Sequence, residues 1–189
     1  MKERILEISK EQKLSHIGSC LSALPIIEEI YNTKRPEDTF VLSSGHAHLA
    51  HLVVREAHGE IDNAAELISH DIHCNTEAGC EVATGSLGLG ITVALGMAIA
   101  DKDKDVYCLI SDGECAEGSV WEALRIKTDM RVDNLKVYVN ANGWGALGGI
   151  DSDILETRLR AFCPDINFVR TNSDFDGTTG VEAHYAQIK

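Results

Sequence analysis

The chain has 189 residues, of which 44% are hydrophobic and 25% are charged, so it is long and apolar enough to build a core and is not a disordered tail. Thirty acidic residues against 17 basic ones give a formal net charge of −13, which argues against a nucleic acid or an anionic membrane as partner. Aromatic residues make up only 5%, too few for base-stacking platforms.

The start of the chain and its cysteines indicate a cellular compartment. Residues 1–13 are charged and helical in pattern, unlike a signal peptide. The longest apolar stretch, residues 87–100, contains three glycines and is shorter than the ~20 apolar residues that cross a bilayer. The six cysteines form no CxxC pair. We therefore expect reduced thiols and a cytoplasmic protein.

Helical and strand patterns alternate along the chain. The periodicity predicts helices over residues 2–13, 21–31, 47–58, 63–69, 88–100, 120–127, 154–162 and 181–189. It predicts strands over residues 39–42, 106–110, 135–139 and 167–171. The helix over residues 88–100 is apolar on every side, which predicts burial all round. Strands separated by helices indicate an α/β fold, with a parallel sheet and helices on both faces.

Two of the predicted strands end in polar residues. Asp112 follows the strand over 106–110, and Asn142 follows the strand over 135–139. In parallel sheets, ligands bind at the carboxyl ends of strands. A carboxylate oxygen, an amide oxygen and a backbone carbonyl just after Asn142 would suit Mg²⁺ or Ca²⁺. Two ordinary turns remain an alternative, because Asp-Gly and Asn-Gly are common turn dipeptides.

A glycine-rich run, residues 84–90, opens the apolar helix. Free backbone N–H groups at a helix start attract phosphate, and glycines let a ligand approach closely. The spacing is GxxGxG, which differs from the dinucleotide-binding fingerprint GxGxxG. Tight packing of the helix against a neighbour explains the glycines equally well.

Histidines and cysteines form another candidate cluster. His46, His48 and His51, together with Cys74 and Cys80, could bind zinc, but their intervals do not match a CxxC…HxxxH ligand set. Two other interpretations stay open. The histidines could be core or surface residues, or they could line a polar pocket that binds hydroxyls and phosphate.

Taken in order, these segments resemble the amino-terminal, diphosphate-binding half of transketolase. The matching runs are Ser15-His16-Ile17-Gly18-Ser19, Leu42-Ser43-Ser44-Gly45-His46-Ala47, Gly79-x-Glu81-x-Ala83-Thr84-Gly85-Ser86-Leu87-Gly88-x-Gly90, Ser111-Asp112-Gly113-Glu114-x-x-Glu117-Gly118-x-x-Trp121-Glu122-Ala123, and Asp133-Asn134-Leu135 with Asn142. The resemblance spans residues 13–151 and is strongest to the separate amino-terminal subunits of split transketolases. It implies a single thiamine-diphosphate-binding domain over residues 1–189, with the pyrimidine-binding and C-terminal domains absent.

The resemblance also implies cofactors and site residues. Thiamine diphosphate would bind with Mg²⁺ or Ca²⁺, and the metal ligands would be Asp112, Asn142 and the Trp144 carbonyl. Matching cofactor-binding positions are Gly85, Leu87, Gly113, Glu114, Asn142 and His46. Matching catalytic positions are His16, His46 and His73, and matching subunit-contact acids are Glu117 and Glu122. Ser111 and Leu89 depart from the family, which has Gly and Gln at these positions.

The function implied is that of a transketolase-type transferase. With a partner subunit that carries the pyrimidine-binding domain, the chain would transfer a two-carbon ketol unit from a ketose or ketose phosphate to an aldose. A homodimer or a heterotetramer is expected. Three alternatives stay open: a 1-deoxy-xylulose-phosphate-synthase-like enzyme half, a non-catalytic cofactor-binding or scaffolding relic, and a simple histidine metal-binding module.

Overall fold

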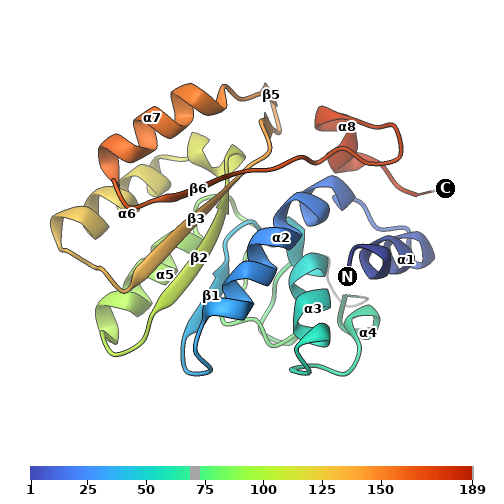
Figure 1. Ribbon diagram of the computed structural model, residues 1–189, viewed down its shortest axis with the longest axis horizontal. Helices are drawn as coiled ribbons and strands as arrows, with labels where there is room; N and C mark the ends of the chain where they lie inside the picture. Colours follow the sequence, from blue (N-terminus) through green and yellow to red (C-terminus); the bar gives the residue numbers. More distant parts are fainter. Residues whose placement is uncertain (69–72, 189) are drawn as a thin grey trace.

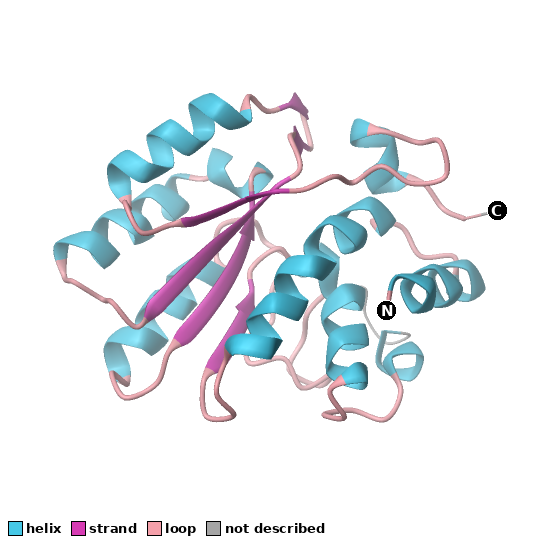
Figure 2. Cartoon of the chain, in the orientation of Figure 1, coloured by secondary structure: helices cyan, strands magenta, loops and turns pink. Residues whose placement is uncertain are grey.

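The structure, a computed structural model, describes residues 1–68 and 73–188. Its centre is a sheet of four parallel strands, drawn in magenta in Figure 2. Their order is β1 (Thr39–Leu42), β2 (Val106–Ser111), β3 (Leu135–Ala141) and β6 (Asn167–Arg170). The predicted α/β fold with a parallel sheet is therefore confirmed.

Helices cover both faces of this sheet (Figure 1). One face carries α1 (Lys2–Gln12), α2 (Ile17–Thr33), α3 (His48–Ala57) and α4 (Ala64–Ile68). The other carries α5 (Gly90–Ala100), α6 (Gly118–Asp129) and α7 (Ser152–Phe162). Shorter elements are η1 (Gly45–Ala47), η2 (Gly113–Ala116), β4 (Trp144–Gly145), β5 (Gly148–Gly149) and α8 (Gly180–Tyr185).

Strand β2 shows how the sheet divides the core in two. Tyr107 and Leu109 pack in the cluster that includes α2 and α3, whereas Cys108 and Ile110 pack in the cluster that includes α5 and α6. Successive side chains of a strand point to opposite faces, so this alternation follows from the geometry of the strand. Every residue of β2 is buried, as expected for a parallel strand covered on both sides.

The predicted helix boundaries differ from the observed ones in three places. Helix α2 begins at Ile17, four positions before the predicted start, because its first turn is packed against the 173–183 segment. The last helix ends at Tyr185, and residue 189 lies outside the described part. Helix α4 ends at Ile68, and the predicted helix end at Ser69 lies outside the described residues.

The prediction that the helix over 88–100 is buried all round is wrong for the single chain. One side of α5 packs into the core through Ile91, Ala94 and Ala98. The opposite side is open, with Val93 40% and Ile99 36% exposed. An apolar side therefore faces outward from the sheet. No helix within the described residues is long and apolar enough to cross a membrane.

Candidate functional site

A cavity of about 210 Å³ lies where the strands of the sheet end. It contains most of the residues that the sequence predicts for the site. Its lining includes His16, Ser44, His46, His73, Gly85, Leu87, Ser111, Gly113, Asn140, Asn142, Trp144, His184 and Tyr185. The structure thus brings together the three predicted histidines, the glycine-rich run and the two polar strand ends.

Asp112 follows β2 directly and is only 1% exposed. Its two carboxylate oxygens accept hydrogen bonds from backbone amides, from Gly113 N at 3.0 Å and from Gly143 N at 2.7 Å. Burial outweighs these hydrogen bonds and raises the pKa of the carboxyl group to about 6. The site therefore holds a buried carboxylate whose charged form would be stabilised by a bound cation.

Two further oxygens lie beside Asp112 on the turn after β3. The amide oxygen of Asn142 accepts a hydrogen bond from Trp144 N at 3.0 Å. The carbonyl oxygen of Trp144 is 3.9 Å from the position of a Cβ on Gly113. A carboxylate, an amide and a carbonyl oxygen are hard donors of the kind that Mg²⁺ and Ca²⁺ prefer. The donor set fits the predicted metal, and it leaves the remaining positions to phosphate or water oxygens.

The predicted histidines line the opposite side of the cavity. The ring centroids of His16 and His46 are 5.6 Å apart. Burial lowers the pKa of His46 to about 3, with smaller effects from neighbouring histidines, and burial also lowers the pKa of His16. His73 lies beside Gly85, where an added Cβ would be 3.3 Å from the ring. At neutral pH, His16 and His46 are uncharged and can both donate and accept hydrogen bonds.

His184 is a cavity residue that the sequence analysis missed. It lies on α8, and its backbone carbonyl accepts a hydrogen bond from His16 N at 2.6 Å. Its Nδ1 is 2.5 Å from Ser19 Oγ, and its Nε2 is buried without a partner in the described structure. An orphaned nitrogen at the cavity is available to a ligand. No spacing in the sequence connects this histidine with the others.

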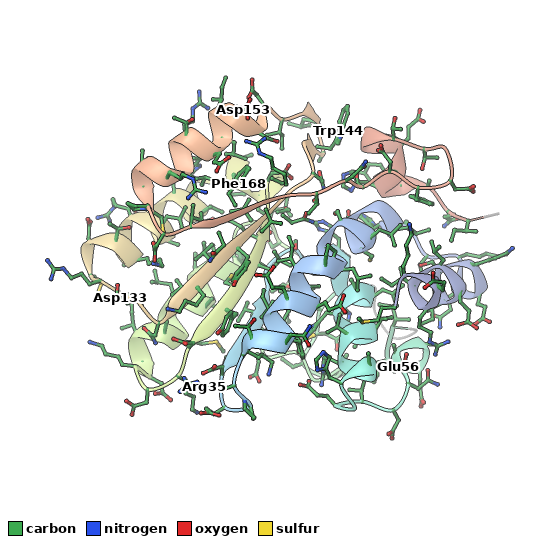
Figure 3. All side chains as sticks on the ribbon, in the orientation of Figure 1. Arg35, Glu56, Asp133, Trp144, Asp153 and Phe168 are labelled. Carbon is green, nitrogen blue, oxygen red and sulfur yellow. The ribbon has the colours of Figure 1, made fainter. Side chains whose placement is uncertain are left out.

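Helix α8 reaches the site through Trp144. The indole ring lies against Gly180, where an added Cβ would be 2.9 Å from Cε2, and Figure 3 shows Trp144 beside this last helix. The carbonyl of Trp144 thus belongs to a turn that is fixed from two directions, by Asn142 and by α8. The carboxyl-terminal segment is part of the wall of the site.

The prediction of Glu114 as a cofactor-binding side chain is wrong for its carboxylate. Glu114 is fully buried, does not line the cavity and accepts hydrogen bonds from Ser43 Oγ at 2.6 Å and from Gly88 N at 2.9 Å. Its other oxygen accepts one from Ser111 N at 2.9 Å. These partners occupy the carboxylate from inside the protein. Its role is to join the end of β2 to the glycine-rich turn.

The two family departures fit the fold. Ser111 is not among the residues with positive φ, and its hydroxyl accepts a hydrogen bond from Glu114 N at 3.2 Å, so glycine is not required there. Leu89 precedes α5 and is 52% exposed. Gly88 does need its type, because its φ is 75° and a Cβ would be 2.5 Å from Ser119 Oγ.

Glu117 and Glu122 lie outside this cavity. Glu117 lines a neighbouring cavity of about 420 Å³, together with Asp112 and Leu87. Glu122 is exposed and forms an ion pair with Arg125 at 2.6 Å, and this partner lowers the pKa of the Glu122 carboxyl group. Both acids face outward at the start of α6. Their predicted role as subunit contacts stays a prediction.

The comparison with protein families establishes the class. Residues 4–177 match the family model described as the transketolase thiamine diphosphate binding domain. The chain therefore belongs to the transketolase thiamine-diphosphate-binding family, as the sequence motifs indicated.

Individual relatives agree with this class. The chain is 37% identical to the first of the named subunits of apulose-4-phosphate transketolase from Phocaeicola vulgatus over 164 residues, which cover 75% of this chain and 58% of that protein. It is 37% identical to transketolase-like protein 2 of Bos taurus over 174 residues, covering 78% of this chain and 28% of the relative. The chain thus spans between about a quarter and three fifths of the length of these curated relatives.

Solved structures confirm the fold. Transketolase from Leishmania mexicana superposes with a TM-score of 0.70 at 21% identity, covering 85% of this chain and 29% of that one. Transketolase from Pichia stipitis superposes with a TM-score of 0.71 at 18% identity, covering 100% of this chain and 39% of that one.

Proposed function

We propose that this chain is the diphosphate-binding subunit of a split, thiamine-diphosphate-dependent transketolase. It would transfer a two-carbon ketol unit from a ketose or ketose phosphate to an aldose, together with a separate subunit that supplies the pyrimidine-binding domain. The similarity to a protein named as one of the subunits of a transketolase supports the split arrangement. The domain boundaries of residues 1–189 and a cytoplasmic location belong to the same proposal.

One observation carries the proposal. A buried, cation-seeking carboxylate and a group of uncharged histidines border one cavity from opposite sides. The oxygen side suits a metal diphosphate, and the histidine side suits the hydroxyl groups of a sugar. A simple histidine metal module would not need the first side. The arrangement instead fits a cofactor bound through its phosphates with a substrate above it.

Each part of the chain has a proposed task. Asp112, Asn142 and the Trp144 carbonyl would hold Mg²⁺ or Ca²⁺ and, through it, the diphosphate. Gly85 and Leu87 would border the thiamine rings. When bound, thiamine diphosphate supplies the nucleophilic carbon and the electron sink for breaking and forming carbon–carbon bonds. Binding, orientation and exclusion of water would be the work of the protein.

The histidines would act on the substrate. An uncharged imidazole can accept a proton from a sugar hydroxyl or donate one to a carbonyl oxygen. His16, His46 and His73 would hold the hydroxyl groups and move protons there. His184 Nε2, buried without a partner in the described structure, adds a fourth nitrogen to this group. Burial keeps the pKa of His46 low, so the anionic diphosphate would be drawn by the metal rather than by this ring.

The proposed assembly is a homodimer or a heterotetramer with the second subunit. The outward apolar side of α5, with Val93 and Ile99, lies on a helix packed against α6, whose first turn follows Glu117. Exposed apolar surface of this kind is typical of an interface. The two acids Glu117 and Glu122 would lie at its edge.

Mixing experiments test the function. The chain, with thiamine diphosphate and Mg²⁺, would be assayed alone and with a subunit that carries a pyrimidine-binding domain, using a ketose phosphate donor and an aldose acceptor. We expect ketol transfer in the mixture only. Transfer of the acyl unit from pyruvate to glyceraldehyde 3-phosphate would instead favour the synthase-like alternative, and cofactor binding without turnover in any mixture would favour the relic.

A matched pair of variants ties the activity to the site. Asp112→Asn removes the carboxylate that would bind the metal, whereas Asp129→Asn removes an exposed carboxylate that pairs with Arg125 at 2.7 Å. We expect the first variant to lose cofactor binding measured by calorimetry and the second to keep it. Equal cofactor affinity in both variants would contradict the metal assignment.

A further inference from the structure

A second cluster of metal-binding side chains lies away from the oxygen donors, between α3 and the loop over residues 73–80. His48 and His51 are three residues apart on α3, and Cys74 and Cys80 come from the loop. All four are buried, with exposures of 0%, 3%, 3% and 7%. Two imidazoles and two thiols therefore share one enclosed space.

The four donor atoms converge on one point. Cys80 Sγ is 3.0 Å from Cys74 Sγ, 3.4 Å from His48 Nε2 and 3.9 Å from His51 Nδ1. Cys74 Sγ is 3.9 Å from the same nitrogen of His51. The ligand atoms of His48, Cys74 and Cys80 all lie within 4.8 Å of one another.

These distances are close to those of a tetrahedral zinc site. With Zn–S bonds of about 2.3 Å and Zn–N bonds of about 2.0 Å, two ligating sulfurs lie about 3.8 Å apart and a sulfur and a nitrogen about 3.5 Å apart. The sulfur–nitrogen contact of His48 already has this length at 3.4 Å. The sulfurs would move apart by less than about 1 Å, and His51 would move inward, to admit the ion.

We infer that His48, His51, Cys74 and Cys80 form a structural Zn²⁺ site. Two thiolates and two imidazoles in a tetrahedral arrangement are the ligands that select zinc over hard cations such as Mg²⁺. The site is therefore chemically separate from the oxygen donors around Asp112.

The surroundings support ligation by His51. Its Nε2 is 2.7 Å from Tyr31 Oη. When Nε2–H donates to this oxygen, Nδ1 presents its lone pair to the two sulfurs, which is the outer contact that ligating histidines usually make. Tyr31 and His51 also line a cavity of about 270 Å³, which provides an entry path for the ion.

A disulfide explains less of the geometry. Sulfur atoms 3.0 Å apart are well beyond the bond length of about 2.05 Å. A disulfide would also use neither imidazole, although both rings turn a nitrogen toward the sulfurs. Apart from this contact, His48 has a buried Nδ1 without a hydrogen-bond partner among the described residues, so Nε2 is the nitrogen through which this ring would act.

The zinc site would fix a loop of the neighbouring cavity. Cys74 follows His73 directly, and its carbonyl accepts a hydrogen bond from Thr84 N at 2.9 Å. Thr84 precedes Gly85, which lies against the His73 ring. A metal ion on Cys74 and Cys80 would thus anchor the segment that places His73 and Gly85 in the cavity.

Metal analysis of the full chain tests the inference. Protein purified with a reducing agent would be incubated with Zn²⁺ alone, desalted and analysed by mass spectrometry of the metal. We expect one zinc per chain, retained against a weak chelator. Loading with Co²⁺ instead is expected to give the intense visible bands of a tetrahedral ion and a thiolate charge-transfer band.

Variants separate the ligands from other buried thiols. Cys74→Ser and Cys80→Ser are expected to lose the zinc and the charge-transfer band. The control Cys163→Ser changes a buried thiol that lies 3.1 Å from Asp165 Oδ1, on the other side of the sheet, and is expected to keep both. Tyr31→Phe is expected to weaken zinc binding about 10-fold while preserving the tetrahedral spectrum.

Three results would overturn the inference. The first is wild-type protein, folded by circular dichroism, that retains no zinc and shows no tetrahedral Co²⁺ spectrum, and this result needs no variant. The second is a Cys74–Cys80 disulfide in protein purified under reducing conditions. The third is loss of zinc in Cys163→Ser together with retention in Cys80→Ser.

Discussion

Replacement of Asp112 by asparagine gives a direct test of how this carboxylate is held. The pKa of the group in the folded chain is about 6 against an ordinary value of 3.8, a difference of about 2.2. Because one pKa unit corresponds to about 1.36 kcal/mol, ionising Asp112 in the folded state costs about 3 kcal/mol more than in the unfolded state. Burial causes this cost, since Asp112 is 1% exposed.

The sign follows from the raised pKa. The folded state binds the proton more tightly than the unfolded state, so this contribution to stability is complete below pH 3.8 and is lost as the pH rises through about 6. Asparagine does not titrate and has no such dependence. Relative to Asp112→Asn, the wild type should therefore lose about 2 kcal/mol of stability between about pH 4 and about pH 7.5.

Urea denaturation in the presence of a chelator measures this difference. The free energy of unfolding of both proteins would be determined across that pH range, with Asp129→Asn as the exposed control. The side-chain amide introduced at position 112 leaves one of the two backbone N–H partners without an acceptor, a constant offset of about 1–3 kcal/mol that does not change with pH. Parallel curves for wild type and Asp112→Asn would refute the reasoning. Excess Mg²⁺ with thiamine diphosphate at neutral pH should stabilise only the wild type.

Three further outcomes are expected. Glu114→Gln should lower the free energy of unfolding by about 2 kcal/mol in urea denaturation, because its amide meets one backbone N–H group instead of accepting from it, and an unchanged value would contradict the assigned hydrogen bonds. Gly45→Ala should destabilise the fold by about 1–3 kcal/mol in the same assay, since the new Cβ would be 2.6 Å from Thr84 O; equal stability would show that the turn relaxes freely. Sedimentation equilibrium should show a species larger than the 20.6 kDa chain, and Val93→Asp should shift it toward the monomer; a wild-type monomer at micromolar concentration would argue against the α5 interface.

The strand ends were predictable because their signal is local. Asp112 and Asn142 each follow a short apolar strand directly, and a parallel sheet places both ends at one edge. The sequence patterns therefore placed them in one site before their distance was known. The same logic placed His46, which follows β1.

Other features depend on contacts between distant segments and had no local signal. His184 reaches the cavity only because α8 packs on the start of α2. The motif predicts Glu114 at the cofactor, but a 3₁₀ turn directs its carboxylate inward to Ser43 and Gly88. Fixed ligand intervals argue against the zinc cluster, but such intervals do not describe ligands that come from a helix and a separate loop.

The outward side of α5 shows a further limit. Periodicity identifies an apolar helix but cannot separate burial within the chain from burial by another chain, since both select the same residues. Ile91 packs inside and Val93 faces out, although both are β-branched and strongly apolar. The pattern therefore predicts the total apolar surface and leaves open what covers it.

The buried Glu114 carboxylate has a mechanical consequence. Through Ser111, Ser43 and Gly88 it connects the ends of β1 and β2 with the turn that begins α5. Three backbone segments are thus locked to one another like struts meeting at a joint, and displacement of one is transmitted to the other two. Substitutions in the glycine-rich turn should alter metal affinity at Asp112 without touching it, and tightening at either end should slow hydrogen exchange at the other.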